Sequence, residues 1–425
     1  MKKDKYLEVR LGGHSLIKKH TCKNGLRIVM EQIPSVRSVT IGIWVLAGSR
    51  NENETNNGIS HFLEHMFFKG TKTRTAQEIA ESFDSIGGHV NAFTSKEYTC
   101  YFAKVLDTHK QFALEMMADM YFNSTFAEVE MEREKKVIAE EIEMYEDTPD
   151  DLVHDLLARA AYGDHPLGYP ILGTESHLKT FTPEMLDDYQ NIHYAPERVV
   201  ISVAGNVDES FVEQIEDYFG TYETPLRQNR IDKPIYLAKE LKQNKDTEQA
   251  HLCLGFNGLS IGDEGIYSLM VMNNVLGGSM SSRLFQEVRE KQGLAYSVFS
   301  YHSSFMDHGL LTIYAGTGNE QLPILKDTID QTIDQLRQNG LTDKELQNSK
   351  EQLKGNLMLN LESTNSRMSR NGRNELLLKR HRTLDEMVQE IDAVDHESIQ
   401  RIIETIFNRE PAIALIAPKP NLIKA

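Results

Sequence analysis

The sequence predicts an α+β protein built from two similar halves, and three observations support this fold class. Strand-like and helix-like patterns are mixed along all 425 residues, which are too many for one hydrophobic core of ordinary size. The order of these patterns returns after about 200 residues, which indicates a weak internal repeat. A polar stretch with two prolines, residues 221–247, separates the two runs. We therefore expect homologous domains at 1–222 and 248–425, joined by a linker at 223–247, each an antiparallel-rich mixed sheet packed with helices.

The first half should open with a strand pair and continue with helices. Asn24-Gly25 is a turn signal, followed by strand-like runs at 26–32 and 38–47. Thr75 and Glu78 form a capping-box pattern, and Thr182-Pro183 is typical of a helix start. The expected strands cover residues 26–32, 38–47, two runs within 89–106, and 199–204. The expected helices cover residues 58–69, 75–86, 108–122 and 127–146.

The second half repeats this order without one feature. Its expected strands cover residues 250–256, 294–301 and 310–315, and its first helices cover 266–276 and 282–292. The halves overlay most clearly at GGHVNAF, residues 87–93, and GLAYSVF, residues 293–299. At residues 271–278, VMNNVLGG stands where SHFLEHMF stands at 60–67, so only the first half has two histidines there.

Composition excludes several classes of protein. The formal net charge of −17 and the absence of a long Lys/Arg run argue against nucleic-acid binding. The sequence has no window of eighteen apolar residues, so no membrane span is expected. The first sixteen residues lack the apolar segment of a signal peptide. The three cysteines are scattered and odd in number, which fits a reducing compartment. We expect a cytoplasmic protein.

The residues with the clearest chemistry lie at 61–65. His61 and His65 are one helical turn apart on the same face, and Glu64 lies close to that face. Two neutral imidazoles at this spacing suit zinc, and a neighbouring carboxylate can take a proton from a metal-bound water. His-x-x-Glu-His is the inverted zincin signature. About 0.1 chance matches to such a motif are expected in this composition, so two partly buried histidines on a helix surface remain an alternative.

Support for a metal comes from the acidic helix expected at 127–146. Glu134 and Glu141 fall within an apolar stripe of Val137, Ile138, Ile142 and Tyr145. A buried carboxylate is costly unless it is paired, hydrogen-bonded or metal-bound. Glu141 can be a third zinc ligand that leaves a position open for water, and Glu134 can be an outer partner. The alternative is that arginines satisfy both acids.

These residues resemble the M16 (pitrilysin-type) metallopeptidases, over nearly the whole chain. The His-x-x-Glu-His of the family falls on His61, Glu64 and His65, its distal glutamate on Glu141, and its preceding acid on Glu134. The resemblance implies a LuxS/MPP-like metallohydrolase fold. It also implies one zinc ion per chain, held by His61, His65 and Glu141, with Glu64 removing the proton of the attacking water and returning it to the leaving amine.

Two further segments carry the resemblance. GGHVNAFTSKEYTCYF, residues 87–102, resembles the family's substrate-binding edge strand, so Asn91, Ala92 and Phe93 are expected to pair with an extended peptide. On sequence alone, an ordinary interior strand is the alternative. RLFQEVREKQGLAYSV, residues 283–298, resembles the stretch whose arginine and tyrosine reach the substrate, here Arg289 and Tyr296. An exposed arginine and a strand tyrosine are the alternative for this pair.

Chain length favours the two-domain bacterial branch of the family, which implies a homodimer around a closed chamber, with Arg289 and Tyr296 acting in trans. The expected substrates are peptides or unfolded segments. Three rival functions remain: a non-catalytic scaffold subunit of the same fold, a peptidase that processes one precursor, and a zinc hydrolase of small molecules. The other histidines, such as His89, His154, His165 and His302, lack ligand spacing with a second candidate.

Overall fold

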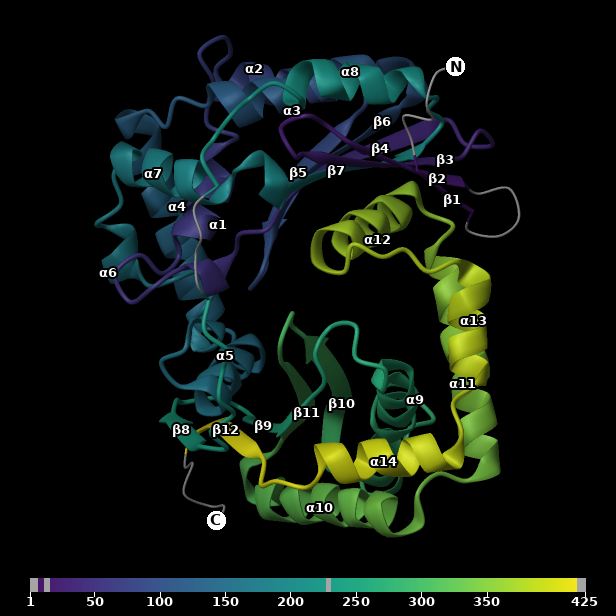
Figure 1. Ribbon diagram of the computed structural model, residues 1–425. Coiled ribbons are helices and arrows are strands. Elements are labelled where there is room, and N and C mark those ends of the chain that lie inside the picture. Colours follow the sequence, from purple (N-terminus) through teal and green to yellow (C-terminus); the bar gives the residue numbers. More distant parts are fainter. Residues whose placement is uncertain (1–6, 11–15, 227–230, 419–425) are drawn as a thin grey trace. The chain divides into compact units, whose positions relative to one another are not determined.

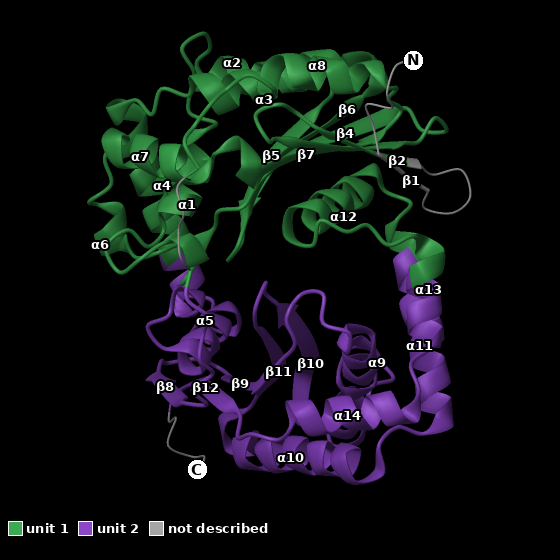
Figure 2. Ribbon diagram, in the orientation of Figure 1, with its two compact units in different colours: residues 1–142, 170–231, 358–386 green, residues 143–169, 232–357, 387–425 purple. Residues whose placement is uncertain are grey.

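The structure is a computed structural model that describes residues 7–10, 16–226 and 231–418 (Figure 1). The first six residues, on which part of the leader expectation rests, and residues 227–230 of the expected linker lie outside the described residues. The chain forms two compact units (Figure 2). Unit 1 contains residues 1–142, 170–231 and 358–386, and unit 2 contains residues 143–169, 232–357 and 387–425.

Unit 1 is built on a seven-stranded mixed sheet with the strand order β1-β2-β3-β7-β4-β6-β5. Only β3 and β7 pair in parallel, and the other neighbours pair antiparallel. The central strands β4 and β7 are buried along nearly their whole length, as their continuous apolar runs predict. The strands are β1 (Leu7–Arg10), β2 (Leu16–Thr21), β3 (Arg27–Gln32), β4 (Ser38–Val45), β5 (His89–Thr94), β6 (Thr99–Leu106) and β7 (Val199–Gly205).

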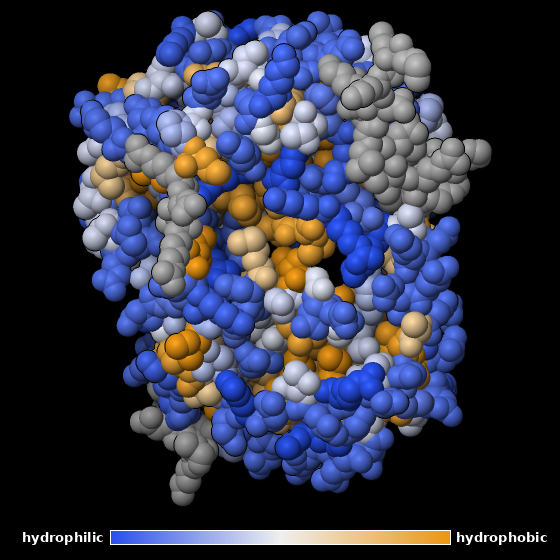
Figure 3. Space-filling model, in the orientation of Figure 1, coloured by the Kyte–Doolittle hydropathy of each residue, from blue (hydrophilic) through white to orange (hydrophobic). Residues whose placement is uncertain are grey.

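Most helices of unit 1 enclose its main apolar core against one face of this sheet. Side chains of α1, α3, α4, α7 and α8 pack with those of β3, β4, β6 and β7 in that core. Figure 3 shows a mostly hydrophilic outer surface over α2 and α8. The helices are α1 (Ile59–Met66), α2 (Ala76–Ser85), α3 (Lys110–Asn123), α4 (Glu128–Glu146), α6 (Glu175–Leu178), α7 (Pro183–His193), α8 (Ser210–Phe219) and α12 (Thr364–Leu377), with α4 continuing into unit 2.

The other face of the same sheet is covered by α12, which comes from far along the chain. The side chain of Met368 is buried against Trp44, whose Nε1 donates to the Met368 sulfur at 3.2 Å. Asn371 donates to the buried carboxylate of Glu31 at 2.6 Å. Gly372 is required here, because a Cβ at this position would lie 2.3 Å from Trp44 Nε1. Residues expected in the second domain thus complete the first sheet.

Unit 2 repeats the strand order of unit 1 in a five-stranded sheet, β10-β11-β9-β12-β8. Its one parallel pair, β12 with β8, matches β7 with β3, and β9, β11 and β10 match β4, β6 and β5 in their antiparallel pairing. The predicted internal repeat is therefore present in the topology. The strands are β8 (Glu240–Asn244), β9 (Ala250–Asn257), β10 (Ala295–Ser304), β11 (Gly309–Thr317) and β12 (Ala412–Ala417).

The helices of unit 2 enclose two apolar clusters, one of which lies between α5 and the sheet. The predicted helix at 282–292 is present, but its core is a π-helical stretch, η5 (Phe285–Lys291). The α-helices are α5 (Pro149–Tyr162), α9 (Ile266–Leu276), α10 (Leu322–Asn339), α11 (Asp343–Asn360), α13 (Leu384–Asp392) and α14 (His396–Ile406). Short 3-10 turns are η1 (Ser49–Asn51), η2 (Asp107–His109), η3 (Pro166–Gly168), η4 (Pro196–Arg198) and η6 (Asn319–Gln321).

Two sequence expectations need correction. The stretch expected as a plain linker contains β8, which pairs with β12, and the buried side chain of Tyr236, whose hydroxyl donates to Gly255 O at 2.6 Å. Val137, placed in the apolar stripe of α4, is 53% exposed. Four-residue spacing from Glu141 put it near the stripe, but the side chain lies beyond the edge of the core.

The predicted capping signals are confirmed. Thr75 accepts from the amide of Glu78, and the Glu78 carboxylate accepts from the Thr75 amide at 2.7 Å. Thr182 caps α7 by accepting from the amide of Met185. Among the helices of the described ranges, none combines the length and the apolar character that crossing a membrane requires.

Candidate metal centre

The position of α1 is fixed at its first turn by a buried carboxylate. Glu52 accepts from the amides of Gly58 at 2.8 Å and Ser60 at 2.9 Å, two donors that have no partner within the helix itself. Gly58 begins the helix at φ 98°, and a Cβ there would lie 2.7 Å from Leu172 O. Burial raises the pKa of Glu52, although four hydrogen bonds oppose this. These contacts set the direction in which the next residues of α1 point.

One turn further on, α1 and α4 bring together three metal-ligating side chains. His61 Nε2 lies 3.8 Å and His65 Nε2 lies 3.7 Å from the same oxygen, Oε2 of Glu141. The two imidazole rings are 4.5 Å apart between centroids. The structure therefore places the three predicted ligands in one cluster, although Glu141 lies more than 70 residues after His65 in the sequence.

The geometry and chemistry of this cluster fit zinc. Zinc–ligand bonds of about 2.0–2.2 Å in a tetrahedral site separate ligand atoms by about 3.3–3.6 Å, close to the observed separations. His61 is held neutral, the form that binds metal, because burial and the nearby His65 lower its pKa to about 3. With two histidines and one carboxylate, a fourth position stays open for water, as in catalytic zinc sites.

Glu134 orients His65 from behind. Its Oε1 lies 2.8 Å from His65 Nδ1, which directs Nε2 toward Glu141. Its Oε2 pairs with Lys69 Nζ at 2.6 Å. A lysine and a histidine therefore satisfy this buried acid, and not the arginine that the sequence left as an alternative. Burial alone raises the pKa of Glu134, but the hydrogen bonds from His65 and Lys69 outweigh burial, and the net pKa is lowered. A carboxylate–histidine–metal chain of this kind holds a ligand in one tautomer.

Glu64 is buried beside the ligands without being one of them in this arrangement. Thr94 donates to its Oε2 at 2.5 Å. Burial raises the pKa of Glu64, which makes it a stronger proton acceptor than an exposed glutamate, and the Thr94 hydrogen bond opposes this change. Glu64 is three residues after His61, so its side chain lies near the helix face that carries the two histidines.

Thr94 is the last residue of β5, and β5 is the edge strand of the sheet. Among the described strands it pairs only with β6, which confirms the predicted edge position. The Ala92 amide donates to Oδ1 of Asn91 at 2.8 Å, which indicates that it points away from β6. Asn91 and Phe93 are exposed, whereas Ala92 packs against the main core. The edge thus ends at the residue that contacts Glu64.

Arg289 and Tyr296 lie together in unit 2. The Arg289 guanidinium is 4.5 Å from the centre of the Tyr296 ring and 4.8 Å from that of Phe285. Arg289 belongs to the π-helical stretch, and Tyr296 is the extra residue at a register shift between Ala295 and Ser297. A bulge turns a side chain out of the regular alternation, and Tyr296 is 77% exposed. Both irregularities present these two side chains at one surface of the unit.

Sequence analysis missed three residues of this centre. Lys69, the partner of Glu134, stands four residues after His65, a spacing that could have indicated it. Thr94 follows Asn91–Phe93 directly, but nothing in a single sequence joins it to Glu64. Glu52 could have been found as an acid shortly before the first turn of a helix, a position where carboxylates are favoured.

Comparison with known proteins now decides the family. Residues 27–175 match the family described as "Insulinase (Peptidase family M16)", and residues 180–353 match "Peptidase M16 inactive domain". Over 407 residues the chain is 60% identical to the "uncharacterized zinc protease YmxG" of Bacillus subtilis (strain 168), covering 96% of this chain and 100% of that protein. The chain belongs to peptidase family M16. The predicted family is thereby confirmed.

Other M16 relatives extend the comparison. The "uncharacterized zinc protease SCO5738" of Streptomyces coelicolor is 41% identical over 96% of this chain and 90% of its own. A solved structure described as a protease from Helicobacter pylori superposes with a TM-score of 0.86 at 24% identity, covering 95% of this chain and 99% of that one. The fold is therefore the M16 fold, with two mixed sheets packed with helices, as the sequence predicted. The description of the second matched segment as inactive agrees with its lack of the histidine pair.

The contact between Glu134 and His65 gives a test of how the M16 metal centre is held. We expect Glu134→Gln to weaken zinc affinity by about 10–100-fold, because the neutral amide no longer polarises His65 Nδ1–H. Competition titration against a chromogenic chelator measures the affinity. Glu143→Gln, an exposed position of the same helix, is the matched control and should change nothing. Equal affinities of the two variants would contradict the role given to Glu134.

Proposed function

We propose that this M16 chain is a zinc-dependent endopeptidase that hydrolyses peptides or unfolded segments. One observation carries the proposal: the ligand atoms of His61, His65 and Glu141 lie within 4.8 Å of one another, with Glu64 buried alongside them. The names of the relatives as zinc proteases support the same activity. A single zinc ion would occupy this centre.

The proposed mechanism assigns each side chain one task. Zinc, when bound by His61, His65 and Glu141, supplies a Lewis acid that lowers the pKa of water and polarises a peptide carbonyl. Glu64 accepts the proton of the attacking water at its carboxylate and then delivers it to the leaving amine. Thr94 holds one Glu64 oxygen, which leaves the other available for this transfer. Glu134 keeps His65 in the tautomer that binds metal.

We expect Glu64→Gln to lower kcat by at least about 10²–10⁴-fold, because the amide cannot accept a proton. Zinc should remain bound, because Glu64 does not complete the ligand set. Cleavage of a quenched fluorescent peptide measures the activity, and metal analysis of the same sample measures the zinc. Glu140→Gln, exposed on α4, is the control. Hydrolysis by Glu64→Gln near the wild-type rate would contradict the assignment of the base.

The edge strand β5 is the proposed platform for substrate. An extended peptide that pairs with β5 gains main-chain hydrogen bonds, which tolerate many side chains. The outward amide of Ala92, now bonded to the Asn91 side chain, is one donor that such a peptide can use. Phe93 is exposed beside it and packs edge-on against Trp44, with ring centroids 5.7 Å apart. Pairing along β5 would deliver the peptide toward Thr94 and Glu64.

We expect Ala92→Pro to raise KM for peptides by about fivefold, since it removes an outward donor whose hydrogen bond contributes about 1 kcal/mol. The pairing of β5 with β6 does not depend on this amide, so zinc content should stay unchanged. Steady-state kinetics with an unstructured peptide provides the measurement. Ala92→Ser keeps the N–H and should retain the wild-type KM. An unaltered KM in the proline variant would exclude peptide pairing at this position.

We further propose that the enzyme is a homodimer in which Arg289 and Tyr296 contact the substrate bound to the partner's zinc centre. Their support is the contact between a half-buried guanidinium and an exposed phenol, two donors suited to a peptide carbonyl and to an oxyanion. Both residues, and the contact between them, belong to unit 2. The trans arrangement rests on the family resemblance.

Mixed dimers test this arrangement. Arg289→Ala chains and Glu64→Gln chains should each be nearly inactive, but mixing them should restore up to about one quarter of the wild-type activity, because a random mixture contains heterodimers with one complete centre. Differently tagged chains allow the heterodimer to be isolated for the assay. Arg289→Ala mixed with wild-type zinc-free protein is the control for exchange. A heterodimer as inactive as its parents would exclude action in trans.

Two of the rival functions are weakened by particular residues. A scaffold subunit needs no ion-holding set, yet His61, His65 and Glu141 form one cluster, with Glu134 in contact with His65 and Glu64 buried alongside. A small-molecule hydrolase needs no free sheet edge beside its base, whereas β5 provides one. Processing of one precursor differs from general degradation only in substrate range, and analysis of products from an unbiased peptide mixture separates them.

The described part of the chain contains no disulfide, which supports a reducing compartment such as the cytoplasm.

A further inference from the structure

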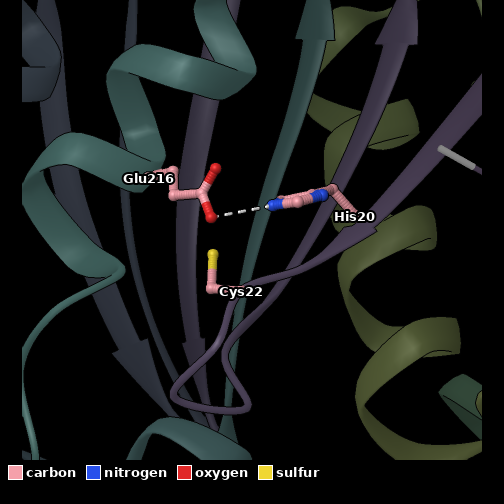
Figure 4. Close-up of side chains that lie close together, drawn as sticks. All are labelled: His20, Cys22 and Glu216. Carbon is pink, nitrogen blue, oxygen red and sulfur yellow. Dashed lines mark ion pairs between the residues drawn. The ribbon is translucent and has the colours of Figure 1, made fainter. Parts of the chain in front are cut away.

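A second cluster of metal-ligating side chains lies in unit 1, formed by residues that the proposed peptidase mechanism does not use. His20 is near the end of β2, and Cys22 follows that strand directly. Residues two apart in extended chain point to the same face, so both side chains are directed toward the helix that covers this part of the sheet. Figure 4 shows the imidazole of His20 and the thiol of Cys22 both turned toward the carboxylate of Glu216.

Glu216 reaches the pair from α8. Its Oε1 lies 3.2 Å from His20 Nε2. The ligand atoms of His20, Cys22 and Glu216 all lie within 4.8 Å of one another. His20 and Cys22 are 7% and 3% exposed, so the imidazole and the sulfur face the protein interior rather than water. In the described ranges, this group and the zinc ligands of the M16 centre are the two sets with such geometry.

The backbone around the cluster is held in place on both sides. Cys22 closes the β2–β3 turn through its amide, which donates to Leu26 O at 2.8 Å, and through its carbonyl, which accepts from Gly25 at 3.0 Å. The Asn24 side chain at the tip of this turn donates to Phe219 O at 2.9 Å and to Tyr222 O at 3.0 Å, at the end of α8. The strand that carries two candidate ligands is thus fastened to the helix that carries the third.

The three groups make a coherent ligand set. Nitrogen, sulfur and oxygen from one histidine, one cysteine and one glutamate suit zinc, whereas calcium and magnesium prefer oxygen alone. In a tetrahedral zinc site the ligand atoms are separated by about 3.3–3.7 Å, and the histidine and glutamate atoms, 3.2 Å apart, are close to this separation. The Cys22 sulfur lies within 4.8 Å of both of these atoms. The bound form of Cys22 is the thiolate, whose charge, together with that of Glu216, the cation would neutralise.

We propose that His20, Cys22 and Glu216 form a second zinc site that fastens the β2–β3 turn to α8. Zinc is bound by His20 Nε2, the Cys22 thiolate and one Glu216 oxygen, with water as the fourth ligand. Binding releases the thiol proton to solvent and involves no oxidation or reduction. This site is separate in its residues from the M16 centre, so it can be present whether or not the chain is a peptidase.

Metal content gives the first test. Untagged wild-type protein dialysed against zinc and then against metal-free buffer should retain two zinc ions per chain. Cys22→Ser should retain one, and Glu141→Gln should retain one, while the double variant should retain none. A wild-type content of one that Glu141→Gln abolishes would overturn the proposal, leaving His20 and Glu216 as an ordinary ion pair beside a thiol. The content does not depend on peptidase activity.

Cobalt gives a test specific to sulfur. Cobalt-loaded wild-type protein should show a thiolate-to-cobalt charge-transfer band in the near ultraviolet, because Cys22 is the ligand, whereas the M16 centre has no sulfur. The band should persist in Glu141→Gln and in Cys253→Ser, the matched control at another buried cysteine, and should vanish in Cys22→Ser. Absence of the band from the wild type, or its survival in Cys22→Ser, would overturn the proposal.

Folding is checked with a milder change. Glu216→Gln keeps the size of the side chain and should weaken cobalt binding at this site by at least about tenfold while the band remains visible at high cobalt. Circular dichroism of Cys22→Ser and Glu216→Gln should match the wild type. Should Cys22→Ser fail to fold, the Glu216→Gln titration decides alone: an unchanged cobalt affinity would refute the assignment of Glu216.

Discussion

The candidate centre depends on a buried carboxylate that joins two helices. Glu134 on α4 contacts His65 on α1 and Lys69 just beyond it, and so fixes α4 against the helix that carries both histidines. A charge buried in this way is stabilising only while its partners remain, so the contact specifies one relative position of the two helices. Glu141, two turns further along α4, then reaches the histidines because Glu134 has set the register.

The same logic extends from the helices to the sheet. Thr94, at the end of the edge strand, is hydrogen-bonded to Glu64, so the edge of β5 and the proposed proton acceptor are fixed to one another by one short contact. Burial lowers the pKa of His61 and raises the pKa of Glu64. The imidazole therefore stays neutral down to a lower pH, and the carboxylate becomes a stronger base. Both changes favour a neutral ligand next to a competent base.

Much of the fold and of the centre could be predicted from sequence, and the failures have physical causes. Most of the strands, the capping signals of Thr75 and Thr182, and the meeting of His61, His65 and Glu141 in one cluster follow from local periodicity and from the cost of burying charge. Val137 was placed wrongly because the angular position on a helix does not say where the core ends. The strand β8 was missed because a partner strand 170 residues later, and not its own polar residues, makes it a strand.

The repeat also shows what the histidine pair replaces. At the corresponding positions of α9, Met272 and Leu276 are fully buried in the core of unit 2. In that unit α9 is held by apolar packing and by polar contacts such as those of Asn274 with Ser349 and Gln352, whereas α1 carries polar groups at the two corresponding positions. In unit 1 the hydrogen bonds of Glu52 and Glu134 hold α1 in place, and they offset the cost of burying polar groups at these positions.

The composition of the two units has a consequence for the chain as a polymer. The backbone passes from one unit to the other five times, at 142–143, 169–170, 231–232, 357–358 and 386–387. No single cut in the gene therefore yields a fragment holding all of one sheet with all of its covering helices; a fragment ending at residue 222 would lack α12 and expose Trp44 and Glu31. Although the two sheets share a topology, each unit is therefore assembled from segments of both halves of the chain.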